Sequence, residues 1–274
     1  MPALGSCGCP RTSITPLKSA QGSSRPLPSW RSRGLRNEAV GRSSSRGNHE
    51  RSFRDRATAG SLDRDTSKRY MPETTVYLVR HGTHDWLRPE HNRFAGAIPG
   101  VALNEQGRLE VQRLAGLLSG EPITWIAASP LQRTMETAEM LARARHLDVE
   151  TDERLLEWRC GVWEGMKIIE IQRRYPSEWK IWREQPDLLR LPGAETVDQM
   201  AARMEVAYRA CSARGGTGVL VSHQDPLAAL LCTLIGAPLR AMRALDIQTA
   251  SLSTSHEMPY GTVIAAINAG RPVA

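Results

Sequence analysis

From about residue 74 onward, short apolar runs alternate with longer segments whose apolar residues recur at helical spacing. Runs at 76–79, 124–128 and 218–221 predict buried strands, and residues 250–256 and 262–268 alternate like two further strands. Helical spacing predicts helices over 104–118, 131–146, 196–213 and 226–235, and helical segments over 163–182 that Pro176 interrupts. Strands that alternate with helices predict an α/β fold with a mainly parallel central sheet and helices on both faces.

The first seventy residues differ in composition from the rest of the chain. They hold fourteen Lys or Arg and five Asp or Glu, whereas the whole chain has 36 and 29. The net charge of +7 therefore belongs to this segment, and the near-neutral remainder is not expected to bind nucleic acid. The segment is rich in Ser, Arg, Gly and Pro and lacks apolar periodicity. We predict a disordered basic extension over residues 1–70 and a folded domain over residues 71–274.

Three origins of the extension stay open: a transit peptide, a basic tail that touches nucleic acid or a membrane, and translated sequence upstream of a true start at Met71. No apolar run reaches the roughly 18 residues of a membrane span, so no membrane association of the folded part is expected. The five cysteines form no disulfide or zinc pattern. We therefore expect a cytoplasmic protein, and the sequence does not predict its oligomeric state.

Polar side chains with related chemistry follow three of the predicted strands. Arg80 and His81 end the first, Ser129 and Arg133 follow the second, and His223 follows the third. Ligands of open α/β sheets bind at the carboxyl ends of the strands, so we expect these side chains to meet in one pocket. Arginine forks bind phosphate oxygens, and a neutral imidazole can attack phosphorus to form a covalent intermediate. The sequence therefore predicts a phosphate site.

Two further residues complete this expectation. A proton donor is needed for the departing oxygen, and Glu157 is the best candidate because its apolar neighbours raise the pKa of a carboxyl group. Gly82 has no side chain, so the backbone is expected to approach the phosphate closely there. A neighbouring arginine disfavours the protonated form of His81, which keeps this imidazole available as a nucleophile.

Five motifs carry a resemblance to a known family. In chain order they are Arg80-His81-Gly82, Ser129-Pro130-Leu131-Gln132-Arg133-Thr134, Glu157 with Gly161-Val162-Trp163-Glu164-Gly165, Pro192-Gly193-Ala194-Glu195, and Ser222-His223. Their order and spacing over residues 74–268 resemble the histidine phosphatase (phosphoglycerate mutase-like) superfamily. Residues 163–195 resemble the helical cap of its phosphatase branch. The resemblance implies a three-layer sandwich with a helical cap insertion.

The same resemblance implies a role for each motif residue. It implies that His81 is phosphorylated in the reaction, that Arg80, Arg133 and His223 form the phosphate cradle, and that Glu157 is first proton donor and then base for the attacking water. It implies neither a metal nor a cofactor. The chain departs from the family pattern at His84, where Thr or Ser is frequent, so the resemblance does not identify the substrate.

Structural alternatives to these roles stay open. The alternative partners are Glu136 for Arg133, Arg154 or Arg159 for Glu157, and Asp225 for His223. Thr83, His84 and Arg93 are secondary candidates, which either contact the ligand or only shape the turn and the loop that carry them. A zinc site built from His81, His84, Asp85 and His91 is not expected, because their spacing is irregular.

We predict a metal-independent phosphomonoesterase that hydrolyses a small organic phosphate through a phosphohistidine on His81. One alternative is phosphoglycerate mutase-type phosphoryl transfer, which needs a second anion site. The cap offers scattered arginines but no dense basic cluster for it. The other is a non-catalytic phosphate-binding module, which the complete set of predicted catalytic residues argues against.

Overall fold

A single mixed sheet organises residues 73–269, which are the residues described by this computed structural model. The predicted extension over residues 1–70 lies outside this range. The strand order is β3-β2-β4-β1-β5-β6. The strands are β1 (Thr74–Arg80), β2 (Ile123–Ala128), β3 (Val149–Thr151), β4 (Gly216–Ser222), β5 (Leu252–Met258) and β6 (Gly261–Ala269). The first four strands are parallel, and β5 and β6 continue the sheet in antiparallel fashion.

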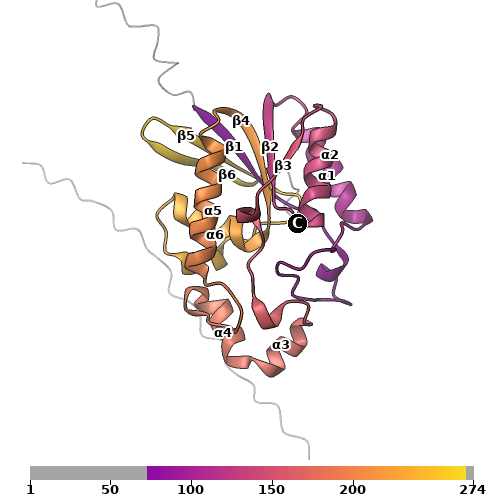
Figure 1. The fold of residues 1–274 in the computed structure, drawn as a ribbon, viewed down its shortest axis with the longest axis vertical. Helices are drawn as coiled ribbons and strands as arrows, with labels where there is room; N and C mark the ends of the chain where they lie inside the picture. The colour runs from indigo at the N-terminus through magenta and orange to yellow at the C-terminus, as the bar shows by residue number, and fades with distance from the viewer. Residues whose placement is uncertain (1–72, 270–274) are drawn as a thin grey trace, which may run out of the picture. The chain divides into compact units, whose positions relative to one another are not determined.

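Helices cover both faces of this sheet (Figure 1). They are α1 (Glu105–Leu117), α2 (Gln132–Arg143), α3 (Ile168–Arg174), α4 (Pro176–Glu184), α5 (Val197–Ser212) and α6 (Gln224–Leu234). One buried apolar cluster joins α1 and α2 to the sheet, and a second joins α5 and α6 to its other face. The helices α3 and α4 lie beyond the carboxyl ends of the parallel strands as a cap. The predicted three-layer sandwich with a helical cap insertion is confirmed.

Local sequence signals begin the helices where the structure has them. The Asn104 side chain accepts a hydrogen bond from the Gly107 N–H at 2.9 Å and caps α1. Thr196 and Gln199 bond each other's backbone N–H groups in a capping box at the start of α5. Pro176 begins α4, because the ring tolerates the first helical turn but not a helix interior.

Two features differ from the sequence prediction. The strand β3 has only three residues, too few for a periodic signal. The helix α2 ends at Arg143 instead of continuing to residue 146. His146 has a φ of 54°, which is the left-handed conformation that ends many helices. Apolar spacing continues past this point, so it did not predict the end of the helix.

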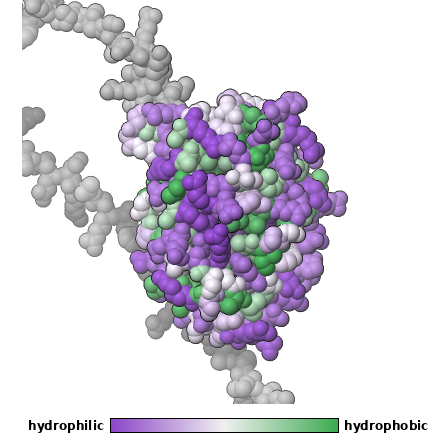
Figure 2. Space-filling view, viewed as in Figure 1, coloured by the Kyte–Doolittle hydropathy of each residue, from purple (hydrophilic) through white to green (hydrophobic). Residues whose placement is uncertain are grey.

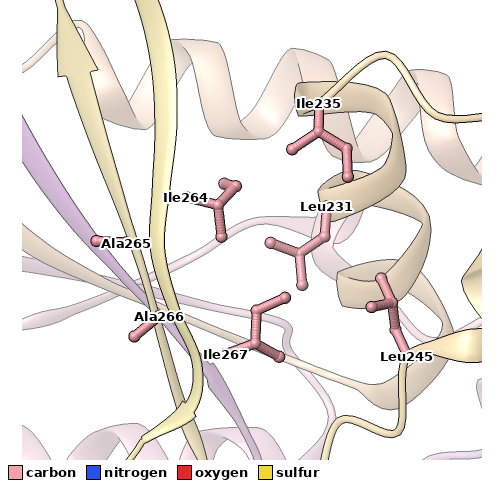
Figure 3. A pocket seen from close by; sticks show the side chains of 7 residues that line it. All are labelled: Leu231, Ile235, Leu245, Ile264, Ala265, Ala266 and Ile267. Atoms are coloured by element: carbon pink, nitrogen blue, oxygen red, sulfur yellow. The ribbon is translucent and has the colours of Figure 1, made fainter. Parts of the chain in front are cut away.

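The surface of residues 73–269 is mostly polar on the face seen in Figure 2, with apolar residues scattered among polar ones. Within this range no helix combines the length and apolar character needed to cross a bilayer. An apolar depression of about 330 Å³ lies between α6 and β6 (Figure 3). Its lining contains none of the residues predicted for the phosphate site, which lie at the strand ends described next.

Candidate active site

The strand ladder brings the predicted phosphate residues together. Arg80 of β1 is in register with Ser222 of β4, and the His81 N–H donates to the Ser222 carbonyl at 3.1 Å. On the other side of β4, the Ser129 N–H donates to the Val221 carbonyl at 3.0 Å. The three segments therefore leave the sheet side by side, as expected for the carboxyl ends of neighbouring parallel strands.

The His81 and His223 imidazoles are buried next to each other, with ring centroids 5.1 Å apart. His81 Nδ1 lies 2.8 Å from its acceptor, the Gly82 carbonyl oxygen. A carbonyl only accepts hydrogen bonds, so Nδ1 carries the proton and the lone pair is on Nε2. Burial, reinforced by the charges of Arg133 and Arg80, lowers the pKa of His81 well below its usual value. A neutral ring with a free Nε2 is the form that attacks phosphorus.

Two guanidinium groups flank these rings. Arg133, in the first turn of α2, is almost fully buried and donates to the Gly96 carbonyl at 2.8 Å and the Ile98 carbonyl at 3.3 Å. Its buried Nε has no partner among the described residues. Burial lowers the pKa of Arg133 to about 10, so the group stays charged near neutral pH. Arg80 donates to Gln224 Oε1 at 2.7 Å. Two charged forks at one cavity suit a phosphate.

The Glu157 carboxyl borders the same cavity. Burial, followed by repulsion from Asp225, raises the pKa of Glu157 to about 7. Its Oε1 accepts the Trp158 N–H at 2.8 Å. A carboxyl group that titrates near neutrality can both give and take a proton in one reaction cycle.

A buried ion pair holds the loop that carries Glu157. Arg203 of α5 pairs with Glu195 and also donates to the carbonyls of Leu156 and Glu157 at 2.6 and 3.0 Å. Glu195 accepts the Arg159 N–H at 3.0 Å. From the sequence, Arg203 is predicted only to lie on the polar side of the helix over 196–213. No local signal indicates that Arg203 also bonds the loop of Glu157, because these contacts depend on how α5 packs against a segment nearly fifty residues earlier.

Gly82 has a role in helix packing that the sequence does not predict. A Cβ on Gly82 would lie 2.7 Å from the carbonyl oxygen of Gly107 in α1. A Cβ on Gly107 would lie 2.0 Å from the Thr83 carbonyl oxygen. The two glycines thus let α1 pack directly against the backbone that follows β1, and this contact fixes the loop that carries His81.

A cavity of about 340 Å³ opens over these groups. Its lining comprises Arg80, His81, His84, Trp86, Leu87, residues 92–96, Arg133, Glu157, Ile168, Trp182, Gln224, Asp225 and Arg243. His223 is not in this lining, because its ring lies fully buried behind His81. The strand ends thus place His81, Arg80, Arg133 and Glu157 around one cavity, on the side that the cap covers, with His223 buried next to His81.

The three secondary candidates fall in two places. His84 and Arg93 line the cavity. Burial lowers the pKa of His84 to about 3, and its Nδ1 has no partner among the described residues. Arg93 donates to the Gly165 carbonyl at 2.7 Å. Thr83 is outside the lining, and its hydroxyl bonds Glu110 and Thr249 instead.

The alternative partners considered from the sequence are not the ones found. Arg133 bonds loop carbonyls and not Glu136, which accepts from Gln132 and Leu103. Arg154 pairs with Asp152 and not with Glu157, which lines the cavity. His223 Nε2 lies 2.9 Å from Ser129 Oγ, and Asp225 pairs with Arg243. Within residues 73–269, no group of three or more His, Cys, Asp or Glu side chains is arranged to hold a metal ion.

A family model described as the histidine phosphatase superfamily (branch 1) matches residues 76–270. The chain belongs to this superfamily. The predicted family and the predicted enzyme class, a histidine phosphatase, are thereby confirmed.

Relatives within the superfamily differ in their named activities. The chain is 32% identical to phosphoserine phosphatase 1 of Hydrogenobacter thermophilus over 195 residues, which are 70% of this chain and 91% of the relative. It is 35% identical to a probable phosphoglycerate mutase of Proteus mirabilis, over 65% of this chain and 82% of the relative. The solved structure of a mycobacterial glucosyl-3-phosphoglycerate phosphatase superposes with a TM-score of 0.63 at 26% identity, covering 72% of this chain and 99% of that chain.

Proposed function

We propose that this histidine phosphatase hydrolyses a small organic phosphomonoester through a phosphohistidine on His81. The observation that carries the proposal is the state of the His81 ring: buried, neutral and protonated on Nδ1, with Nε2 free in a cavity lined by two arginines. The cavity volume of about 340 Å³ suits a small substrate.

In the first step, His81 Nε2 forms a bond to phosphorus as the bond from phosphorus to the ester oxygen breaks. Arg80 and Arg133 hold the phosphoryl oxygens, whose charge the guanidinium groups offset, while the buried His223 ring packs against His81 with ring centroids 5.1 Å apart. Glu157 gives its proton to the ester oxygen, so the leaving group departs as a neutral alcohol.

In the second step, the roles of Glu157 reverse. Its carboxylate takes a proton from a water molecule, the water oxygen bonds to phosphorus, and the bond from phosphorus to Nε2 breaks. Inorganic phosphate leaves, and His81 and Glu157 return to their starting forms. A pKa of about 7 for Glu157 supports both roles, because neither protonation state is costly near neutral pH.

The test is phosphate release from a panel of phosphomonoesters in EDTA, by the full chain and by its His81→Ala variant. We expect metal-independent turnover that falls by at least about 10³-fold in the variant. His146→Asn is the matched control, because this histidine lies at the far end of α2 and asparagine tolerates its left-handed backbone. Equal rates in His81→Ala and wild type, with both proteins folded, would overturn the proposal.

Mutase activity is a second candidate, since a relative with 35% identity is named a probable phosphoglycerate mutase. The same phosphohistidine would then pass its phosphoryl group to a phosphoglycerate hydroxyl instead of to water. Incubation with 3-phosphoglycerate distinguishes the two: a hydrolase yields inorganic phosphate, whereas a mutase yields the 2-phospho isomer.

A further inference from the structure

A second carboxylate lines the cavity of Glu157. Asp225, in the first turn of α6, has a side chain that is only 8% exposed. Arg243 donates to both of its oxygens, from Nη1 to Oδ1 at 2.6 Å and from Nη2 to Oδ2 at 3.3 Å. The proposed reaction steps do not use this ion pair, although it borders the space that the substrate would enter.

Groups from two further segments hold the Asp225–Arg243 pair in place. The Arg243 Nε donates to the Trp182 carbonyl of α4 at 3.0 Å. The guanidinium lies 4.0 Å from the Trp182 ring centroid and 5.8 Å from that of Trp158, the residue that follows Glu157. A carboxylate held this firmly stays in the cavity instead of turning toward solvent.

Glu157 faces charged or titratable groups from every segment around it. They are Arg80, His81 and His84 after β1, Arg133 on α2, Cys160 in its own loop, Arg203 on α5, His223 and Asp225 at the start of α6, and Arg243. The three imidazoles are neutral, because burial lowers the pKa of each. Burial likewise raises the pKa of Cys160 and keeps its thiol neutral. Glu164, which accepts the Cys160 N–H at 3.1 Å, is a further acidic group close to these residues, but Asp225 is the carboxylate whose repulsion raises the pKa of Glu157.

Repulsion by Asp225 opposes the nearby positive charges. Arg133, Arg80 and the Trp158 N–H each lower the pKa of Glu157, and Asp225 raises it by more than any one of them. Without Asp225, a carboxyl between two arginines would lose its proton more easily.

We propose that Asp225 is a positioning residue for Glu157: clamped by Arg243, it keeps a negative charge in the cavity that holds the proton on Glu157 until the leaving group takes it. This inference rests on the proposed function, in which Glu157 is the proton donor. Asp225 is not among the reacting groups, and within residues 73–269 no hydrogen bond joins it to Glu157.

Asp225→Asn tests the charge while keeping the shape. We expect the carboxyl of Glu157 to lose its proton at lower pH, which moves the alkaline limb of kcat/KM for an alkyl phosphate down by about one pH unit. Arg243→Gln removes the opposing charge and should move the same limb upward. Merely structural damage would not shift the limb in opposite directions in the two variants. An unmoved limb in Asp225→Asn would overturn the proposal.

A measurement without turnover separates this inference from the proposed function. Carboxyl ¹³C NMR of the full chain labelled in glutamate, assigned with Glu157→Gln, follows the titration of Glu157 directly. Asp225→Asn should lower its midpoint, whereas Glu150→Gln, which removes an exposed partner of Arg214, should leave it unchanged. A shift without any phosphatase activity would refute the proposed function alone; an unchanged midpoint in an active enzyme would refute only the role of Asp225.

Discussion

The two ends of the cavity are built in different ways. At the phosphate end, Arg80 ends β1, His81 follows it, and Arg133 lies in the first turn of α2, which follows β2. Backbone hydrogen bonds between neighbouring strands align these segments. At the cap end, Trp182 comes from α4 and Arg243 from a short 3₁₀ segment (Leu239–Ala244), and the Arg243 side chain joins them by bonding the Trp182 carbonyl and lying over the Trp182 ring. In the proposed reaction the sheet therefore positions the reacting groups, and the cap lines the space for the leaving group.

This difference provides a physical reason for one fold to carry the different activities named for its relatives. The carboxyl ends of the central strands tolerate little change, because shifting the register of β4 by one residue would turn the His223 ring to the other face of the sheet. A cap held by side chains can change without disturbing the strands. We expect variants at the phosphate end to abolish turnover of every substrate and variants at the cap end to reorder the substrates.

Among variants that keep His81, the largest effect is expected at the phosphate end, from Arg133→Met. Loss of the charged fork should lower kcat/KM by about 10²–10³-fold for every ester in the panel, because the phosphoryl group is common to all. Arg143→Met, an exposed arginine of the same helix, is the control and should retain wild-type rates. Steady-state kinetics on aryl and alkyl esters measure kcat/KM for both variants. A loss confined to one ester would contradict the prediction.

Glu157→Gln should separate the leaving groups. For alkyl esters kcat should fall by about 10²-fold or more, because a poor leaving group needs a proton. For p-nitrophenyl phosphate the first step needs no proton, so the phosphohistidine should form and then accumulate without a base for water. Alkaline quenching followed by phosphohistidine detection measures this, and equal losses for both esters without accumulation would argue against the acid role.

Gly107→Ala tests the backbone contact behind the phosphate end. The added Cβ meets the Thr83 carbonyl at 2.0 Å, so we expect unfolding to become easier by about 1–3 kcal/mol and kcat to fall as the His81 loop moves. Gly116→Ala in the same helix meets nothing within 4 Å and should stabilise by up to about 1 kcal/mol. Urea unfolding of both variants gives the values, and a stable, fully active Gly107→Ala would refute this account.

The smallest change in rate is expected at the cap end. Trp182→Ala removes a cavity wall and the ring beneath Arg243, but no group that touches phosphorus. We expect kcat/KM for the smallest alkyl ester to change by less than about tenfold, with larger losses for esters that have bulky leaving groups. The measurement compares kcat/KM for each ester of the panel between wild type and Trp182→Ala. An equal loss for all esters would indicate that Trp182 acts on the phosphoryl group and not on the leaving group.

The sequence predicts the phosphate end well and the cap end poorly, for one physical reason. Arg80, Arg133 and His223 follow apolar strands or begin a helix, and topology brings strand ends together whatever lies between them. Asp225 and Arg243 meet only because the 3₁₀ segment folds back on α6. No spacing along the chain encodes that contact.

The same limit applies to details near the site. Thr83 lies next to the cavity residue His84, yet its hydroxyl bonds Glu110 and Thr249. The role of Gly82 depends on Gly107, 25 positions further along the chain, and this pairing has no local signal.

The adjacency of β1, β4 and β2 has a consequence for how the protein folds. Arg80 and Gln224 are 144 residues apart in the chain, and Ser129 and His223 are 94 apart, yet each pair is hydrogen-bonded. Contacts between such distant segments form slowly, because the entropy cost of closing a long loop precedes the stabilising energy of the contacts. The cavity thus exists only after the centre of the sheet has assembled. Recovery of activity after dilution from denaturant should therefore lag behind recovery of helical circular dichroism. Enzyme activity would then serve as a kinetic probe of sheet assembly.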